Sequence, residues 1–152
     1  MGLITFKKLS TAEKEQCYKQ ALAENRLNFL FDIEDFDVDN LKNQKVYAGF
    51  DGDKIIVFYY FYGLNENTLK IAFGYLGKFN KTVLKIIEHC LKSFRQEYGI
   101  IGEVNSKNTA TIKLCKRLWN PPFMVLEGAD KNNTDRYIFY WSKTKTEGNW
   151  NG

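Results

Sequence analysis

The chain has 152 residues and a mass of 17.8 kDa, which is the length of one domain. Hydrophobic residues make up 44% and charged residues 26%, so the composition excludes a disordered chain, a collagen-like chain and a disulfide-packed mini-protein. The formal net charge of +4 is too small to require a nucleic-acid partner by itself.

Three cysteines lie far apart in the sequence, at Cys17, Cys90 and Cys115. There is no Cys-x-x-Cys pair, which argues against a disulfide framework and against a zinc site, and no metal is expected. The cysteines are expected to be reduced and to pack as small hydrophobic residues in a cytoplasmic protein. No run approaches the ~18 apolar residues of a membrane span, and the N-terminus lacks the apolar stretch of a signal peptide.

A short alternating strand is expected first, over residues 4–9, followed by a helix to about residue 24. This helix begins at the capping box Ser10-Thr11-Ala12-Glu13, in which each of the two end residues can bond the backbone N–H of the other. Residues 27–43 are expected to form a short helix or a loop. Strands follow over 46–50 and 54–62, joined by a hairpin turn at Asp51-Gly52-Asp53. The second strand is apolar without alternation, which predicts burial on both faces.

The second half is expected to begin with a strand over 69–73 and a break over 74–78. A long helix over 80–98 is predicted from apolar residues that recur on one face, namely Val83, Ile86, Ile87, Cys90, Leu91 and Phe94. A strand over 100–104 and a helix over 108–120 follow, and Pro121-Pro122 is expected to stop that helix. Strands over 123–126 and 136–141 close the domain.

These elements predict a single domain over residues 1–143 and a flexible tail over 144–152. The fold class is α/β of the α+β type, with a mixed, mostly antiparallel sheet of six or seven strands and three or four helices. One helical crossover is expected to join the fourth and fifth strands.

The element order resembles that of the GNAT superfamily of N-acetyltransferases from residue 4 to about residue 142. A local pattern adds to the resemblance: the family often has Asn-x-x-Ala-x-x-Leu-Tyr-x-x-x-Gly-Phe, and Asn108, Ile112, Leu114 and Leu118 fit it. The resemblance implies a divergent GNAT-like acyl-CoA N-acyltransferase domain. It also implies that acetyl-CoA, as co-substrate, enters an opening between the fourth and fifth strands.

In this family, backbone N–H groups at the start of the next helix hold the pyrophosphate. The loop is usually Gln/Arg-x-x-Gly-x-Gly/Ala, whereas Leu76–Lys81 contains a single glycine, Gly77, and has Phe79 and Lys81 where small residues are usual. The resemblance assigns cofactor binding to Phe73, Tyr75, Gly77, Lys78, Phe79, Asn80, Lys81 and Asn108.

Acetylation of an amine needs a base for the ammonium proton and often an acid for the leaving thiolate. Many family members carry a glutamate on the fourth strand, but this strand has no carboxylate. Glu103, on the fifth strand, is the next candidate base, or else an ordinary strand residue. Alignment on Asn108 puts Cys115 where many members have a catalytic tyrosine; it is either the acid or a core thiol. Tyr75 is the other candidate acid, and His89 is a candidate base or a residue at the core edge.

Charge is divided unevenly along the chain. Residues 1–66 contain 8 basic and 11 acidic side chains, whereas residues 67–152 contain 14 basic and 7 acidic side chains. Lysines at 78, 81 and 85 and basic residues at 113, 116 and 117 can meet the phosphates of CoA or a nucleic-acid backbone, or form solvated helix faces. The aromatic strand at 58–62 is interpreted as core, so nucleic acid is not the expected partner.

The acidic segment over residues 32–39 is a second charged feature. It resembles the opening of a calcium loop, but Asn40 and Val46 stand where that loop needs glycine and glutamate. In the GNAT family this region lines the acceptor side, so the segment either attracts a basic acceptor or forms a solvated loop.

The resulting hypothesis is an acetyl-CoA-dependent N-acetyltransferase that acts on an amine of a basic small molecule or protein. The expected partners are a CoA thioester and an amine acceptor, with no membrane. The alternative is a catalytically lapsed GNAT fold that acts as a binding or structural protein, for example in a phage or mobile-element assembly, as a homo-oligomer or with an assembly partner.

Overall fold

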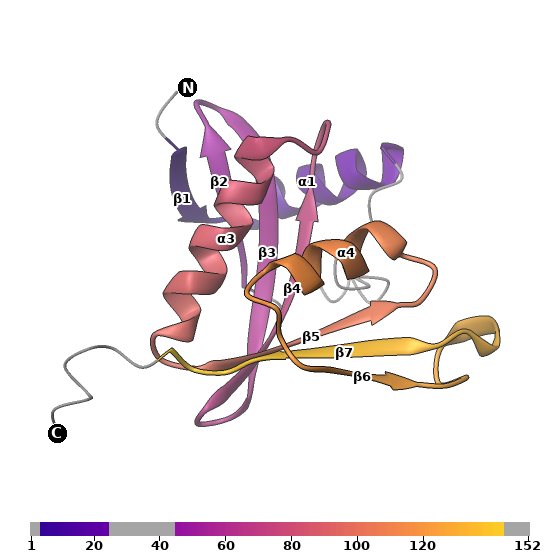
Figure 1. Ribbon diagram of the computed structural model, residues 1–152. Coiled ribbons are helices and arrows are strands. Elements are labelled where there is room, and N and C mark those ends of the chain that lie inside the picture. The colour runs from indigo at the N-terminus through magenta and orange to yellow at the C-terminus, as the bar shows by residue number, and fades with distance from the viewer. Residues whose placement is uncertain (1–3, 25–44, 145–152) are drawn as a thin grey trace, which may run out of the picture.

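The computed structural model describes residues 4–24 and 45–144. Seven strands form one mixed sheet in the order β1-β2-β3-β4-β5-β7-β6 (Figure 1). The strands are β1 (Ile4–Lys8), β2 (Val46–Asp51), β3 (Lys54–Asn65), β4 (Thr68–Tyr75), β5 (Gly99–Asn105), β6 (Phe123–Leu126) and β7 (Arg136–Trp141). The expected α+β fold and mostly antiparallel sheet are confirmed, because β4 and β5 form the one parallel pair among the described strands.

Three α-helices accompany the sheet in the described part of the chain. They are α1 (Thr11–Ala23), α3 (Lys81–Arg95) and α4 (Thr109–Arg117). In Figure 1, α3 and α4 lie in front of the sheet and α1 lies behind it. The crossover from β4 to β5 runs through α3, because two parallel neighbours cannot be joined by a tight turn.

The capping box before α1 and the turn of the first hairpin form as the local sequence predicts. Ser10 N–H donates to Glu13 Oε1 (3.0 Å) and Glu13 N–H donates to Ser10 Oγ (3.2 Å), which completes the capping box of α1. Gly52 has φ +63° in the turn between β2 and β3, a conformation that glycine adopts without strain. Short-range chemistry therefore sets both features.

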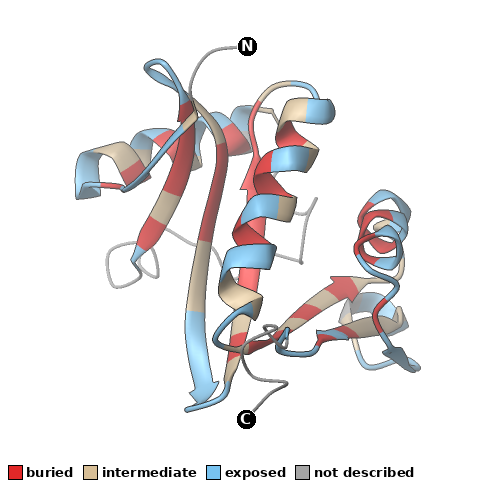
Figure 2. Ribbon diagram, turned by 60° about the vertical axis from the view of Figure 1, so that its left-hand side comes forward, coloured by how far each residue is buried: buried red, intermediate tan, exposed pale blue. Residues whose placement is uncertain are grey.

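The core lies on both faces of the sheet: one layer packs against the apolar face of α3, and the other includes Cys17 and Ala21 of α1. Its largest fully buried side chains include Trp141, Phe58, Phe73 and Phe139. Five of the six apolar positions expected on α3 are buried, and the sixth, Phe94, is partly buried against the same core. Figure 2 shows α3 with its buried face toward the sheet and its exposed face outward.

Helix α4 ends at Arg117, so the expected extension to residue 120 is wrong. Trp119 and Asn120 adopt left-handed φ values of 62° and 46°, which a continuing helix cannot contain. The turn lets the carbonyl of Leu118 accept a 2.7 Å hydrogen bond from the buried Trp141 indole N–H. A tertiary contact therefore ends α4 before the two prolines.

The helix or loop expected over residues 27–43 and most of the tail expected over 144–152 lie outside the described residues. Thr144, the first residue of the predicted tail, is described. Its backbone N–H donates to the carbonyl of Arg95 at 2.7 Å.

Gly74 provides a test of core packing. A Cβ at this position would stand 2.2 Å from Cζ of Phe58, whose side chain is fully buried. We expect Gly74→Ala to lower the free energy of unfolding by about 1–3 kcal/mol, because the ring has no free space to move into. Urea denaturation measures this difference.

The matched control is Gly63→Ala, in which the nearest atom to the added Cβ is the Asn65 carbonyl oxygen at 3.6 Å. This variant should unfold close to the wild type. Equal stability of the two alanine variants would contradict the predicted clash.

Candidate functional site

The strands β4 and β5 pair over only three residues and then separate. Their parallel register runs Thr68↔Gly99, Leu69↔Ile100 and Lys70↔Ile101. Beyond Lys70, β4 continues to Tyr75 alongside β3, while β5 continues to Asn105 alongside β7. Figure 1 shows the two strands diverging. The sheet therefore opens in a V whose apex lies at Lys70 and Ile101.

The main chain of β4 lines this opening. Leu76 N–H donates to the Ile56 carbonyl at 3.0 Å, which marks that pair as hydrogen-bonded across the β3–β4 ladder. Because such pairs alternate along antiparallel strands, Gly74 directs its backbone groups toward β3, and Phe73 and Tyr75 direct theirs toward the V. Phe73 and Tyr75, two of the residues that the resemblance assigned to cofactor binding, thus turn their backbone groups toward the opening.

A cavity of about 320 Å³ lies between α3 and α4 at this end of the sheet. Its lining comprises Tyr75, Phe79, Leu84, Glu88, Ala110, Thr111, Lys113, Leu114, Arg117 and Leu118. The Tyr75 and Phe79 rings meet edge to face, with centroids 5.4 Å apart. The lining is mostly apolar, and Lys113 and Arg117 from α4 outnumber the one acidic residue, Glu88, which suits a ligand with an apolar arm and an anionic end.

The loop from β4 to α3 lies next to the cavity. Gly77 adopts φ +77°, so the turn depends on a glycine at this position. Asn80 is the N-cap of α3, where its side-chain oxygen accepts from Val83 N–H at 3.0 Å. The exposed Lys78 and Lys81 flank this helix terminus, and the first turn of α3 contains no acidic residue. This end of α3 is therefore electropositive.

A carboxylate already contacts this loop. Glu24, directly after α1, accepts a 2.6 Å hydrogen bond from Gly77 N–H through Oε1, and its Oε2 accepts from the Gln20 side chain at 3.0 Å. The two partners of the first bond are 53 residues apart in sequence. The contact shows that Gly77 N–H is oriented to bind an anion.

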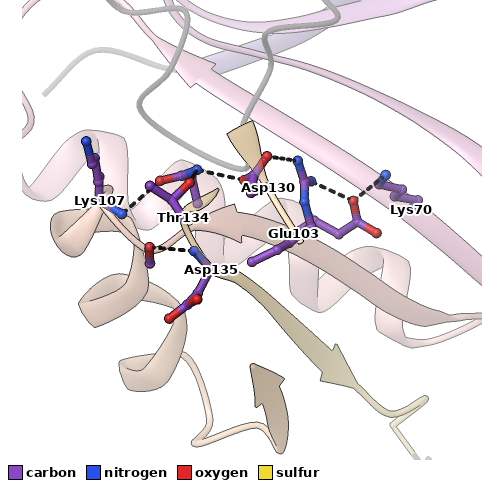
Figure 3. Close-up of polar contacts among 9 residues, drawn as sticks. Lys70, Glu103, Lys107, Asp130, Thr134 and Asp135 are labelled. Atoms are coloured by element: carbon purple, nitrogen blue, oxygen red, sulfur yellow. Dashed lines mark hydrogen bonds and ion pairs between the residues drawn. The ribbon is translucent and has the colours of Figure 1, made fainter. Parts of the chain in front are cut away.

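Glu103 lies just beyond the apex of the V. It follows Ile101 by two residues on β5 and lies on the face opposite the buried Val104, because neighbouring strand residues point to opposite faces. Its Oε2 accepts from Lys70 Nζ (2.8 Å) and from Arg136 (2.9 Å) (Figure 3). No hydrogen bond or ion pair joins Oε1 to residues 4–24 or 45–144. Partial burial by itself would lower the pKa of Lys70. The hydrogen bond to Glu103 and the negative charge of Glu103 outweigh this effect, so the pKa of Lys70 is raised above its usual value.

The charged contacts continue from Glu103 across the β5–β7 ladder to the connection between β6 and β7. Arg136 also donates to Asp130 at 2.8 Å, and Asp130 accepts from Asn105 at 2.7 Å. The Asp130 side chain is 4% exposed, so its charge is compensated within the protein. Figure 3 shows this chain of contacts running from Lys70 to Thr134. It fixes the β6–β7 connection beside the V.

The remaining candidate residues lie in four different places. Tyr75 lies in the cavity wall, and Asn108 caps α4 by accepting from Thr111 N–H at 3.3 Å. Cys115 is fully buried in the core, where burial raises the pKa of its thiol. His89 is exposed and stacks on Phe6, with ring centroids 5.4 Å apart.

All three cysteines are unpaired and buried, as expected for core thiols. Burial raises the pKa of Cys17 and of Cys90 to about 12, so neither thiol ionises near neutral pH.

Sequence reasoning did not find Glu24, Lys70 or Arg136. Each reaches its partner from an element 33 or more residues away, and no local motif signals such a contact. The acidic segment over 32–39 lies outside the described residues. Within the described ranges, no group of three metal-ligating side chains was found and no helix is long and apolar enough to cross a membrane.

No protein-family model matches this sequence, and no curated protein matches it. Solved structures do match. The acetyltransferase from Salmonella typhimurium that modifies the N-terminal serine of the 50S ribosomal subunit protein L7/L12 has a TM-score of 0.73 at 9% identity, covering 91% of this chain and 94% of that chain.

Two further structures extend the comparison. A GNAT-family acetyltransferase from Bacillus anthracis gives a TM-score of 0.72 at 13% identity, covering 93% of this chain and 96% of that one. The putative acetyltransferase yncA from Salmonella typhimurium, solved with its cofactor acetyl-CoA, gives a TM-score of 0.67 at 12% identity. That match covers 95% of this chain and 96% of that one. The chain therefore has the fold of the GNAT N-acetyltransferases.

Proposed function

We propose that this protein is an acetyl-CoA-dependent N-acyltransferase that acts on an amine. The observation that carries the proposal is the V between β4 and β5, which opens beside the cavity and beside the electropositive start of α3. A cofactor with an apolar arm, a thioester and a diphosphate needs these three environments side by side. The shared fold of acetyltransferases adds support.

The residues of the site fit a CoA thioester. Gly77 N–H binds a carboxylate in this structure, so the loop accepts an anion despite its single glycine. Lys78 and Lys81 would add charge for the diphosphate, while Phe79 and Asn80 would shape the loop around it. Asn108 would act indirectly, by fixing the start of α4 beside the cavity. The backbone N–H groups of Phe73 and Tyr75 would polarise the thioester carbonyl.

The thioester supplies an activated acyl group, and the chain's own residues would handle the protons. Glu103 would orient the acceptor through Oε1 and take the proton that the amine loses as its nitrogen bonds to the acyl carbon. The thiolate leaves, and Tyr75, in the cavity wall, would protonate it. Because Cys115 is sealed in the core, we assign the acid role to Tyr75 and a packing role to Cys115.

We propose a primary amine of a basic small molecule or of a protein as the acceptor. The Salmonella enzyme of the same fold that modifies an N-terminal serine makes peptide N-termini the first acceptors to screen, followed by polyamines and lysine peptides.

The cavity variant Ala110→Trp tests cofactor binding. Ala110 lines the cavity, and an indole there would fill the space between α3 and α4. By isothermal titration calorimetry, we expect acetyl-CoA to bind the wild type and to bind Ala110→Trp at least tenfold more weakly. At ~100 times its dissociation constant, acetyl-CoA should also stabilise the wild type by roughly 2.7 kcal/mol.

The control is Thr109→Trp, one residue earlier on α4 and outside the cavity lining. ATP serves as the phosphate control. Equal stabilisation by ATP and acetyl-CoA, or no binding of either, would contradict the proposal.

Glu24 is expected to compete with the cofactor for Gly77 N–H. An anionic side chain at the C-terminal end of α1 is opposed by the helix dipole, which favours its release. We expect Glu24→Gln to lower the dissociation constant for acetyl-CoA about three- to tenfold in the same titration. Glu15→Gln, also on α1, controls for net charge and should leave affinity unchanged. Weaker binding by Glu24→Gln would instead assign Glu24 to ordering the loop.

Glu103 is tested by Glu103→Gln, which keeps the shape of the side chain and removes its basicity. We expect turnover to fall about 10²- to 10⁴-fold, the usual contribution of a general base, while acetyl-CoA binding persists. Release of free CoA thiol in the presence of the amine panel measures turnover. Glu127→Gln, outside the V, should retain the wild-type rate. Unchanged turnover in Glu103→Gln would remove this residue from the mechanism.

A further inference from the structure

The solvent face of α3 carries a continuous row of basic side chains. Lys81, Lys85, His89, Lys92 and Arg95 follow one another at spacings of four, four, three and three residues. These spacings keep them on one side of the helix, opposite the buried positions such as Ile87. Figure 2 shows that exposed residues recur along the outer side of α3. Lys81 lies at the end of α3 nearest the cavity, and we call the other four residues the α3 cation row.

The lysines of this row are not neutralised by neighbours. Lys85 and Lys92 form no ion pair with residues 4–24 or 45–144. Glu88 is the one acidic residue within α3, and it also lines the cavity toward α4. Like charges at i and i+4, such as Lys81 and Lys85, destabilise a helix. Because Glu88 is outnumbered by the lysines and Arg95, the outer face of α3 is net positive.

The cation row ends at an exposed aromatic platform. The Trp119 side chain is 46% exposed, and the Arg95 guanidinium lies 5.0 Å from the centroid of its ring. Arg95 is held in place by a 2.9 Å hydrogen bond from its Nε to the Ser142 carbonyl. Trp119 itself lies just after α4, where its left-handed φ of 62° is incompatible with a continuing helix. The platform is therefore built by three separate segments of the chain.

The row and the platform border one hollow of about 550 Å³. Its lining includes Lys85, His89, Lys92, Arg95 and Trp119, with Glu88 at the boundary with the cavity of the candidate site. Lys85 and Arg95 are ten residues apart, which is ~15 Å along a helix. A ligand with several anionic groups and one flat aromatic group would match the basic side chains and the indole of this lining.

We propose that this hollow binds a single-stranded nucleic acid, with phosphates along the α3 cation row and one unpaired base stacked on Trp119. Charge complementarity accounts for the phosphates, and stacking on an exposed indole accounts for the base. A duplex keeps its bases stacked on each other and cannot use the platform. An acidic protein would use the lysines but not the indole.

The test is fluorescence anisotropy with a labelled 12-nucleotide oligouridylate, without acetyl-CoA, over 50–200 mM salt. In Lys85→Glu/Lys92→Glu, affinity should fall at least tenfold. The slope of log K against log salt should become less steep by about 1.4, because two phosphate contacts are lost. Lys19→Glu/Lys54→Glu changes net charge equally at exposed sites on α1 and β3, and should lose less than threefold.

The stacking step is tested separately with Trp119→Ala. Affinity for the oligouridylate should fall about tenfold with an unchanged salt slope, whereas Trp119→Phe should retain most of it. Binding of a 12-base-pair RNA duplex should not respond to Trp119→Ala. Thermal unfolding checks that each variant is folded.

Three results would overturn the proposal. One is equal weakening by the two lysine pairs. Another is competition by polyglutamate as effective as that by unlabelled oligouridylate. The third is loss of acetyl-CoA binding, without loss of RNA binding, in Lys85→Glu/Lys92→Glu, which would assign the row to the cofactor. Because the RNA measurements contain no acetyl-CoA, their outcome is independent of the proposed acyl transfer.

Discussion

The rest of the site depends on one constraint, the end of β4–β5 pairing at Lys70 and Ile101. Each strand keeps its other neighbour beyond this point, β3 for β4 and β7 for β5, so the sheet opens without losing either strand. The backbone of Phe73 and Tyr75 then faces an opening instead of a ladder. A parallel pair that continued to Tyr75 would use those groups in the sheet and leave no entry between the strands.

Charge holds the apex of this opening. Glu103 joins Lys70 on one arm of the V to Arg136 on β7, and Arg136 passes the connection on to Asp130 and the β6–β7 connection. The partners are partly or largely buried, so the contacts are less screened than surface ion pairs. On the other side of the sheet, α3 contributes its apolar face to the core and its positive N-terminus to the loop at Gly77. The two faces of the sheet therefore differ in chemistry: one carries the ion pairs of Glu103, and the other carries the apolar face and the positive N-terminus of α3.

Several elements were predictable because their causes are local. The capping box before α1, the Asp-Gly turn and the apolar face of α3 are each set by residues within a few positions of one another. The helical crossover between the fourth and fifth strands was expected and is present, and Tyr75, a residue that the resemblance assigned to cofactor binding, lines the cavity. The predicted end of α4 was wrong by three residues. The hydrogen bond between Leu118 and Trp141 joins residues that are 23 positions apart, and local sequence does not signal such a contact.

By itself, the sequence determined most elements, since hydrophobic periodicity and turn chemistry act over short distances, while its resemblance to the GNAT family supplied the fold type and the list of candidate site residues. Tertiary structure alone decided what those residues face. It buried Cys115 in the core, attached Glu103 to two cations and brought Glu24 onto Gly77. It also aligned Trp119 with the basic face of α3. These outcomes depend on contacts between distant segments, and one-dimensional spacing does not encode which segments meet.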